Sequence, residues 1–172
     1  MKRLLVLCLA LGLAGSALAQ IQVGSAHRIE FARGEGLLTA RDGAQARFQF
    51  RVRQEGENPA EGALKFTAAG PHGSTLTIHT ERLPRLQVRG EHASFGGPAV
   101  LEVSRTPNSE GFRWVGQVVV KIRNDVRIGD GRDARIVDVM EIAFTTERTD
   151  RRYEFAGVTP PRNIQIGVRI GS

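Results

Sequence analysis

The chain has 172 residues with 24 Lys or Arg and 18 Asp or Glu, a formal net charge of +6. This length indicates one domain. Cys8 is the only cysteine and it lies in the apolar N-terminal run, so the remainder of the chain contains no disulfide, cysteine nucleophile or cysteine metal ligand.

The first nineteen residues have the pattern of a bacterial secretory signal peptide. Lys2 and Arg3 precede an apolar run over 4–14, and Ala17-Leu18-Ala19 is a small-x-small cleavage site. Cys8 lies inside the apolar run, which argues against lipidation. We therefore predict an exported protein, periplasmic or extracellular, whose mature chain is a single all-β domain over 20–172. No second apolar run reaches 18 residues, so no transmembrane segment is expected in that chain.

Alternation of apolar and polar residues predicts strands almost throughout the mature chain. In "ARFQFRVR", residues 46–53, Phe48, Phe50 and Val52 face one side and arginines face the other. Similar patterns occur over 62–66, 74–80, 85–90, 92–105, 112–124, 135–146, 152–155 and 163–171. About ten strands predict an antiparallel β-sandwich or a partly closed barrel. The paired aromatic girdles of an outer-membrane barrel are missing.

The order of several short motifs resembles the post-COAP type domain, a small β domain of exported bacterial proteins. The matching motifs are Gly34-x-Gly36, which opens a strand, Phe48-x-Phe50-x-Val52, Gly62-x-Leu64-x-Phe66, Leu86-x-Val88-x-Gly90-x-x-Ala93-x-Phe95-x-Gly97 and Ile142-x-Phe144. The similarity covers about residues 34–146. It implies an extracytoplasmic β module and transfers no catalytic residue.

Acidic residues gather in "RIGDGRDARIVDVMEI", residues 127–142. Calcium takes six to eight oxygen ligands, and Asp130 and Asp133 could supply some, with Asp125 joining from the end of the preceding strand. The spacing is not that of an EF-hand. Asp-Gly is also the preferred pair of a tight two-residue hairpin turn, and two long strands flank it. We predict the hairpin turn, with calcium as the alternative and no other cofactor.

No catalytic motif is present. The four histidines, which are His27, His72, His79 and His92, lack the close spacing of local zinc motifs. The chain contains no Gly-x-Ser-x-Gly elbow. We therefore predict a protein that is not an enzyme.

Basic residues share the polar faces of three predicted strands. These residues are Arg47, Arg51 and Arg53 in one strand, Arg85 and Arg89 in another, and Lys121 and Arg123 in a third. If the strands are neighbours, the residues form a basic stripe suited to carboxylates and phosphates. Phe48 and Phe50 face the other way, which argues against nucleic acid. A solvated face offset by nearby glutamates is the alternative interpretation.

These observations favour an exported binding or structural module. The expected partners are acidic polysaccharide, anionic lipid head groups or another envelope protein. Two alternatives remain open. One is a β-barrel that holds a small apolar molecule in a cavity lined by Phe48, Phe50, Phe66 and Phe95, and the other is an enzyme with an unrecognised site.

Overall fold

The computed structural model describes residues 27–80, 82–104, 111–130, 134–149 and 151–171. The predicted signal peptide lies outside these residues. No helix within the described ranges combines the length and the apolar composition of a membrane span.

The described chain is built of ten strands and one short 3₁₀ turn, η1 (Pro71–Gly73). All strand pairs are antiparallel, as predicted. The strands are β1 (His27–Thr39), β2 (Gln45–Glu55), β3 (Glu61–Ala69), β4 (Thr75–Thr80), β5 (Arg85–Arg89), β6 (His92–Ser104), β7 (Phe112–Ile128), β8 (Arg135–Thr146), β9 (Arg152–Thr159) and β10 (Ile164–Gly171).

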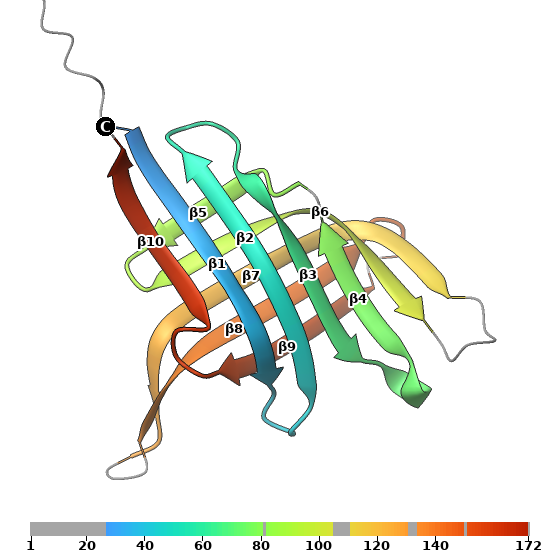
Figure 1. The fold of residues 1–172 in the computed structure, drawn as a ribbon. Helices are drawn as coiled ribbons and strands as arrows, with labels where there is room; N and C mark the ends of the chain where they lie inside the picture. The colour runs from blue at the N-terminus through green and yellow to red at the C-terminus, as the bar shows by residue number, and fades with distance from the viewer. Residues whose placement is uncertain (1–26, 81, 105–110, 131–133, 150, 172) are drawn as a thin grey trace, which may run out of the picture.

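Eight strands form a closed barrel, and β5 and β10 are added at its corners. The barrel order is β1-β2-β3-β4-β6-β7-β8-β9, and pairing of Thr39 with Val158 returns it to β1. Strand β10 continues beside β1, and β5 pairs with β6. In Figure 1 the strands β10 and β1–β4 form a front layer that crosses a rear layer of β5–β9. Of the two predicted architectures, the structure is therefore the barrel, and it is closed.

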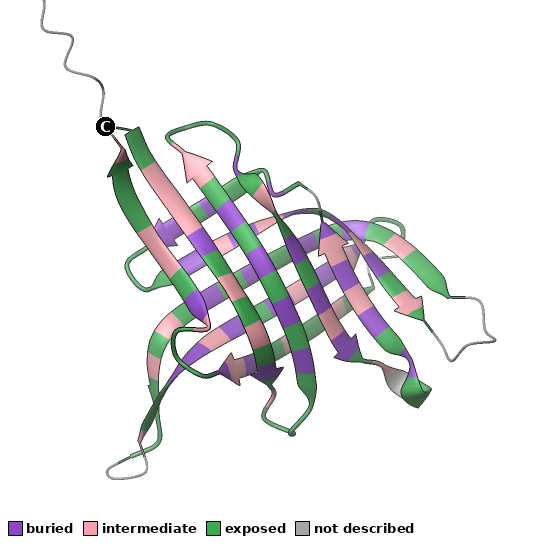
Figure 2. Cartoon of the chain, in the orientation of Figure 1, coloured by how far each residue is buried: buried purple, intermediate pink, exposed green. Residues whose placement is uncertain are grey.

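Alternation of side chains explains why these segments form strands around one core. Along β2 the residues are exposed and buried in turn, and Figure 2 shows the same banding on the neighbouring strands. Phe48, Phe66 and Phe144 are among the largest fully buried side chains. Burial of each such side chain contributes roughly 1.5–3 kcal/mol to folding.

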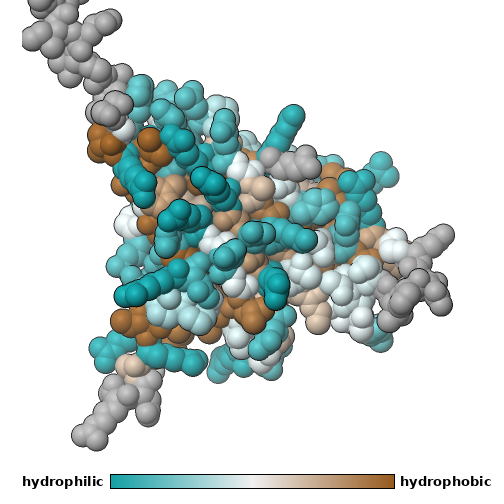
Figure 3. All heavy atoms as spheres, viewed as in Figure 1, coloured by the Kyte–Doolittle hydropathy of each residue, from teal (hydrophilic) through white to brown (hydrophobic). Residues whose placement is uncertain are grey.

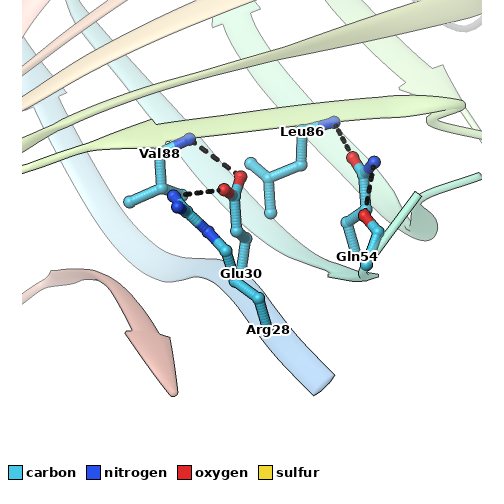
Figure 4. Close-up of polar contacts among 6 residues, drawn as sticks. Arg28, Glu30, Gln54, Leu86 and Val88 are labelled. Atoms are coloured by element: carbon cyan, nitrogen blue, oxygen red, sulfur yellow. Dashed lines mark hydrogen bonds and ion pairs between the residues drawn. The ribbon is translucent and has the colours of Figure 1, made fainter. Parts of the chain in front are cut away.

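Strand β1 begins at His27, seven residues before the predicted start at Gly34. Glu30 has the same parity along β1 as the buried Ala32 and Leu38, but its side chain is charged. Glu30 faces the free edge of β5 instead of the core. Its carboxylate accepts the Val88 N–H at 3.0 Å and pairs with Arg28 at 2.7 Å (Figure 4).

A second side chain also accepts an N–H group at this edge of β5. The Gln54 amide oxygen accepts the Leu86 N–H at 2.8 Å (Figure 4). Buried or half-buried N–H groups at a sheet edge require such partners. Strands β1 and β2 therefore hold the edge of β5 through side chains, although β5 belongs to the other layer.

A buried carboxylate holds the start of the other added strand, β10. Asp138 is 1% exposed, and its two oxygens accept the N–H groups of Asp125 at 3.2 Å and Ile164 at 3.3 Å. Asp125 has a φ of 54° and lies in a bulge of β7, where the pairing with β8 shifts between Arg123 and Val126. Burial raises the pKa of Asp138 above its ordinary value of 3.8.

Candidate functional site

A groove of about 860 Å³ crosses the outer face of the front layer. Figure 3 views this face, which hydrophilic side chains largely cover. Cross-strand pairing places its lining residues in two adjacent rows. One row contains Gln165, Arg33, Arg51 and Ala63, and the other contains Glu35, Gln49, Lys65 and His79.

The turn between β9 and β10 adds Arg162 to the groove. Glu35 donates its N–H to the Asn163 carbonyl at 3.2 Å, which fixes this turn against β1. A Cβ at position 34 would lie 2.9 Å from the same carbonyl oxygen. Gly34, the first residue of the Gly34-x-Gly36 motif, therefore permits the close approach that brings Arg162 to the groove.

The groove is strongly cationic. Among the described residues, Arg33, Arg51, Lys65 and Arg162 line it against one carboxylate, Glu35, for a formal charge of +3. Within the described residues, none of these four cations forms an ion pair. The Arg33 guanidinium donates to Gln165 Oε1 at 2.9 and 2.6 Å, which orients it and leaves its charge uncompensated. Such a groove concentrates anions.

The three predicted arginines of β2 do share the outer face, but they have different surroundings. Arg51 lies in the groove. Arg47 lines an adjoining hollow of about 500 Å³ that shares Glu35 and Gln49 with it. Arg53 pairs with Glu55 at 3.2 Å and lies opposite Glu61 on β3, so nearby carboxylates offset its charge.

The other predicted basic residues lie on the outer face of the rear layer. Arg89 and Arg123 flank His92 in register across β5, β6 and β7. With Lys121 they line a hollow of about 450 Å³ that also includes Glu141, which is 3.9 Å from Arg123. Its formal charge is +2, counting three cations and one carboxylate. Arg85 is exposed on the same strand as Arg89, opposite Gly96.

The condition for a single basic stripe, that the three strands are neighbours, is met only in part. Strands β5 and β7 both neighbour β6, so their basic residues do come together. Strand β2 belongs to the other layer, and among the described strands it pairs with β1 and β3 alone. Two basic surfaces result, and the hydrophobic core lies between them.

The acidic loop lies partly outside the described residues, at 131–133. The last described pair of β7 and β8 joins Ile128 to Arg135, so the two-residue hairpin turn between these strands stays a prediction. Asp125 lies in the bulge and not at the end of β7. Asp133 is outside the described residues. Among the residues that are described, no three His, Cys, Asp or Glu side chains are placed to hold a metal ion. Calcium binding by Asp125, Asp130 and Asp133 stays a prediction.

The interior at the four phenylalanines proposed as a cavity lining is packed. Phe48, Phe50, Phe66 and Phe95 are at most 3% exposed. The ring centroids of Phe50 and Phe95 are 5.1 Å apart, and those of Phe48 and Phe50 are 5.9 Å apart. Phe66 contacts the rings of Tyr153 and Phe155 instead. A barrel that holds a small apolar molecule among the four phenylalanines stays a prediction.

Sequence reasoning missed Arg33, Lys65 and Arg162 as members of the groove. Arg33 lies in the part of β1 that was not predicted as a strand. Lys65 is at an outward position of a predicted strand, so alternation places it on the polar face. Alternation does not show which residues of other strands lie beside it. No local pattern marks Arg162, because its position depends on how the turn rests on β1.

The protein is thus an antiparallel β-barrel with a cationic groove on its outer face. Comparisons of the chain with protein-family models, with curated proteins and with solved structures find no match. The resemblance to the post-COAP type domain thus stays a prediction.

Proposed function

We propose that this protein is an exported, non-catalytic binding module that holds an acidic polysaccharide in the groove of the front layer. The observation that carries the proposal is the groove's lining in the described part of the chain, which has four cations and one carboxylate with no ion pair between them. Carboxylate or sulfate groups along a polymer would supply the missing counter-charges.

The shape of the groove supports a chain-like ligand. It extends across five strands, from Gln165 on β10 to His79 on β4. Gln49, Gln165 and Asn163 add neutral hydrogen-bonding groups to its lining. Sugar hydroxyls need such partners beside the charges. The rear hollow has about half the volume and a lower net charge, which makes it the weaker candidate.

Binding to a polyuronate tests the proposal. We expect the double variant Arg51→Gln, Lys65→Gln to bind polygalacturonate about tenfold more weakly than the parent at low salt, a loss of about 1.4 kcal/mol. The parent's affinity should fall steeply between low and moderate salt, since exposed charges are screened. Isothermal titration calorimetry or salt elution from an immobilised polymer measures both effects.

Two controls separate the groove from general basicity. Arg127→Gln together with Arg113→Gln removes the same charge outside the groove, on β7, and should leave binding within about twofold of the parent. Arg89→Gln with Lys121→Gln tests the rear hollow. Equal losses in all three double variants would mean that net charge alone attracts the polymer, and a loss confined to the rear variant would move the site there.

A further inference from the structure

Another hollow opens at the end of the barrel where β4, β6, β7, β8 and β9 meet, and its lining is mostly apolar. Its volume is about 540 Å³. Ligand pockets usually occupy roughly 300–1,000 Å³. The main apolar side chains around it are Leu76, Leu101, Val103, Trp114, Phe144 and Tyr153.

The lining forms a floor and walls. Leu76, Leu101 and Phe144 are buried and form the floor. Val103, Trp114 and Tyr153 are only partly buried, although they pack against the core and point inward. Apolar side chains that stay partly hydrated at an inward position favour an apolar occupant, because it would remove them from water.

The charged side chains that line the rim within the described residues are basic. They are Arg151 and Arg152, and no carboxylate lines the hollow beside them. Arg152 is paired with Glu154, whereas Arg151 forms no ion pair within the described part of the chain. The turn that carries Arg151 is fixed on Thr146, whose hydroxyl accepts the Arg151 N–H at 3.1 Å.

Tyr153 adds a neutral donor inside the hollow. Burial raises the pKa of its hydroxyl above the ordinary value of 10.0, so the group stays protonated at neutral pH. A guanidinium fork and a hydroxyl above an apolar floor are complementary to a carboxylate on an alkyl chain.

We infer that the end of the barrel binds a long-chain carboxylate, with its alkyl chain between Trp114 and the buried floor and its head group at Arg151. The inference concerns a different site from the outer groove and does not depend on the polysaccharide proposal. It also differs from the predicted cavity at Phe48, Phe50, Phe66 and Phe95, whose rings are packed.

The chain offers a direct reporter of occupancy. Trp114 is its only tryptophan and lines the hollow. The purified mature protein is titrated with dodecanoate below its micellar concentration, while tryptophan emission is recorded and calorimetry supplies a second readout. We expect a saturable blue shift. Dodecanol, which has the same chain without the charge, should bind about tenfold more weakly.

Variants test the head-group and chain contacts separately. Arg151→Gln should weaken dodecanoate binding about tenfold and leave dodecanol unaffected. Arg148→Gln is the matched control, since Arg148 is exposed in the same turn but does not line the hollow. Val103→Glu should abolish binding of both ligands. Arg51→Gln with Lys65→Gln should change neither.

Two results would overturn the inference. The first is the absence of both a saturable emission change and a heat of binding for dodecanoate. The second is equal binding by the Arg151→Gln and Arg148→Gln variants together with equal affinities for acid and alcohol. The second test remains decisive if Val103→Glu does not fold.

Discussion

A carboxylate anchors each of the two strands that the barrel adds at its corners, but the two carboxylates lie in different environments. Asp138 holds the start of β10 from a buried position, and within the described residues no basic side chain pairs with it. Glu30 holds β5 from a side chain that is 17% exposed, and Arg28 compensates its charge at 2.7 Å.

The comparison teaches that a carboxylate that accepts a backbone N–H is less favourable in its charged form at a buried site than at a partly exposed one. Both carboxylates accept backbone N–H groups, which favours their charged forms. Burial disfavours the charge of Asp138 and raises its pKa. Each anchored strand also carries one side of a basic surface, because Gln165 on β10 lines the front groove and Arg89 on β5 lines the rear hollow.

We expect the largest effect from Asp138→Ala. The substitution leaves the N–H groups of Asp125 and Ile164 without their acceptors, at a cost of about 2–4 kcal/mol in the free energy of unfolding. Urea denaturation measures it. Asp42→Ala is the control, since Asp42 accepts the Ala44 N–H in an exposed turn at 3.0 Å and should cost no more than about 1 kcal/mol. Similar losses in both variants would contradict the importance of burial.

The pH dependence of stability sharpens the comparison. The folded state holds the Asp138 proton more tightly than the unfolded chain, in which the pKa is near 3.8. The stability from this group is therefore fully present below pH 3.8 and is lost as pH rises through the higher folded pKa. Asp138→Asn should remove that decline. Unfolding free energies of parent and variant, measured from pH 3 upward, check it, and parallel curves would refute it.

We expect a smaller loss in the free energy of unfolding when Glu30, which anchors β5, is replaced. Glu30→Ala removes the acceptor of the Val88 N–H and the partner of Arg28, at a cost of about 1–1.5 kcal/mol. Glu30→Gln keeps an acceptor and loses only the charge, so it should retain at least half of that stability. Chemical denaturation of both variants provides the test. A loss as large as that of Asp138→Ala would contradict the expectation that the buried anchor contributes more stability than the partly exposed one.

The smallest effect is expected for Gln54→Ala. It removes a neutral bond to the Leu86 N–H in a partly buried setting, at a cost of about 0.5–1 kcal/mol. Hydrogen exchange of the Leu86 amide gives a local readout. Its exchange should accelerate in this variant while the Val88 amide stays protected by Glu30. Acceleration of both amides together would show that β5 opens as a unit.

The sequence alone predicts a large part of the secondary structure. Period-two alternation identifies nine of the described strands, because each has one face toward a common core. It ends β3 at Phe66 and β9 at Phe155, several residues before the strands end. It also places Arg47, Arg51 and Arg53 on one solvent face. The prediction is weakest where an inward residue is polar. Glu30 and Asp138 face strand edges that only the tertiary structure creates, so alternation did not indicate that these two carboxylates anchor β5 and β10.

What the sequence by itself determined is the all-β class, the strand faces and the excess of arginine. Only the tertiary structure decided which strands are neighbours. Pairing of β1 with both β2 and β10 joins Arg33 to Arg51 and Gln165, and the turn that rests on Gly34 brings Arg162 to them. The physical reason is that strand order and register arise from contacts between residues far apart in the chain, whereas alternation is a local property.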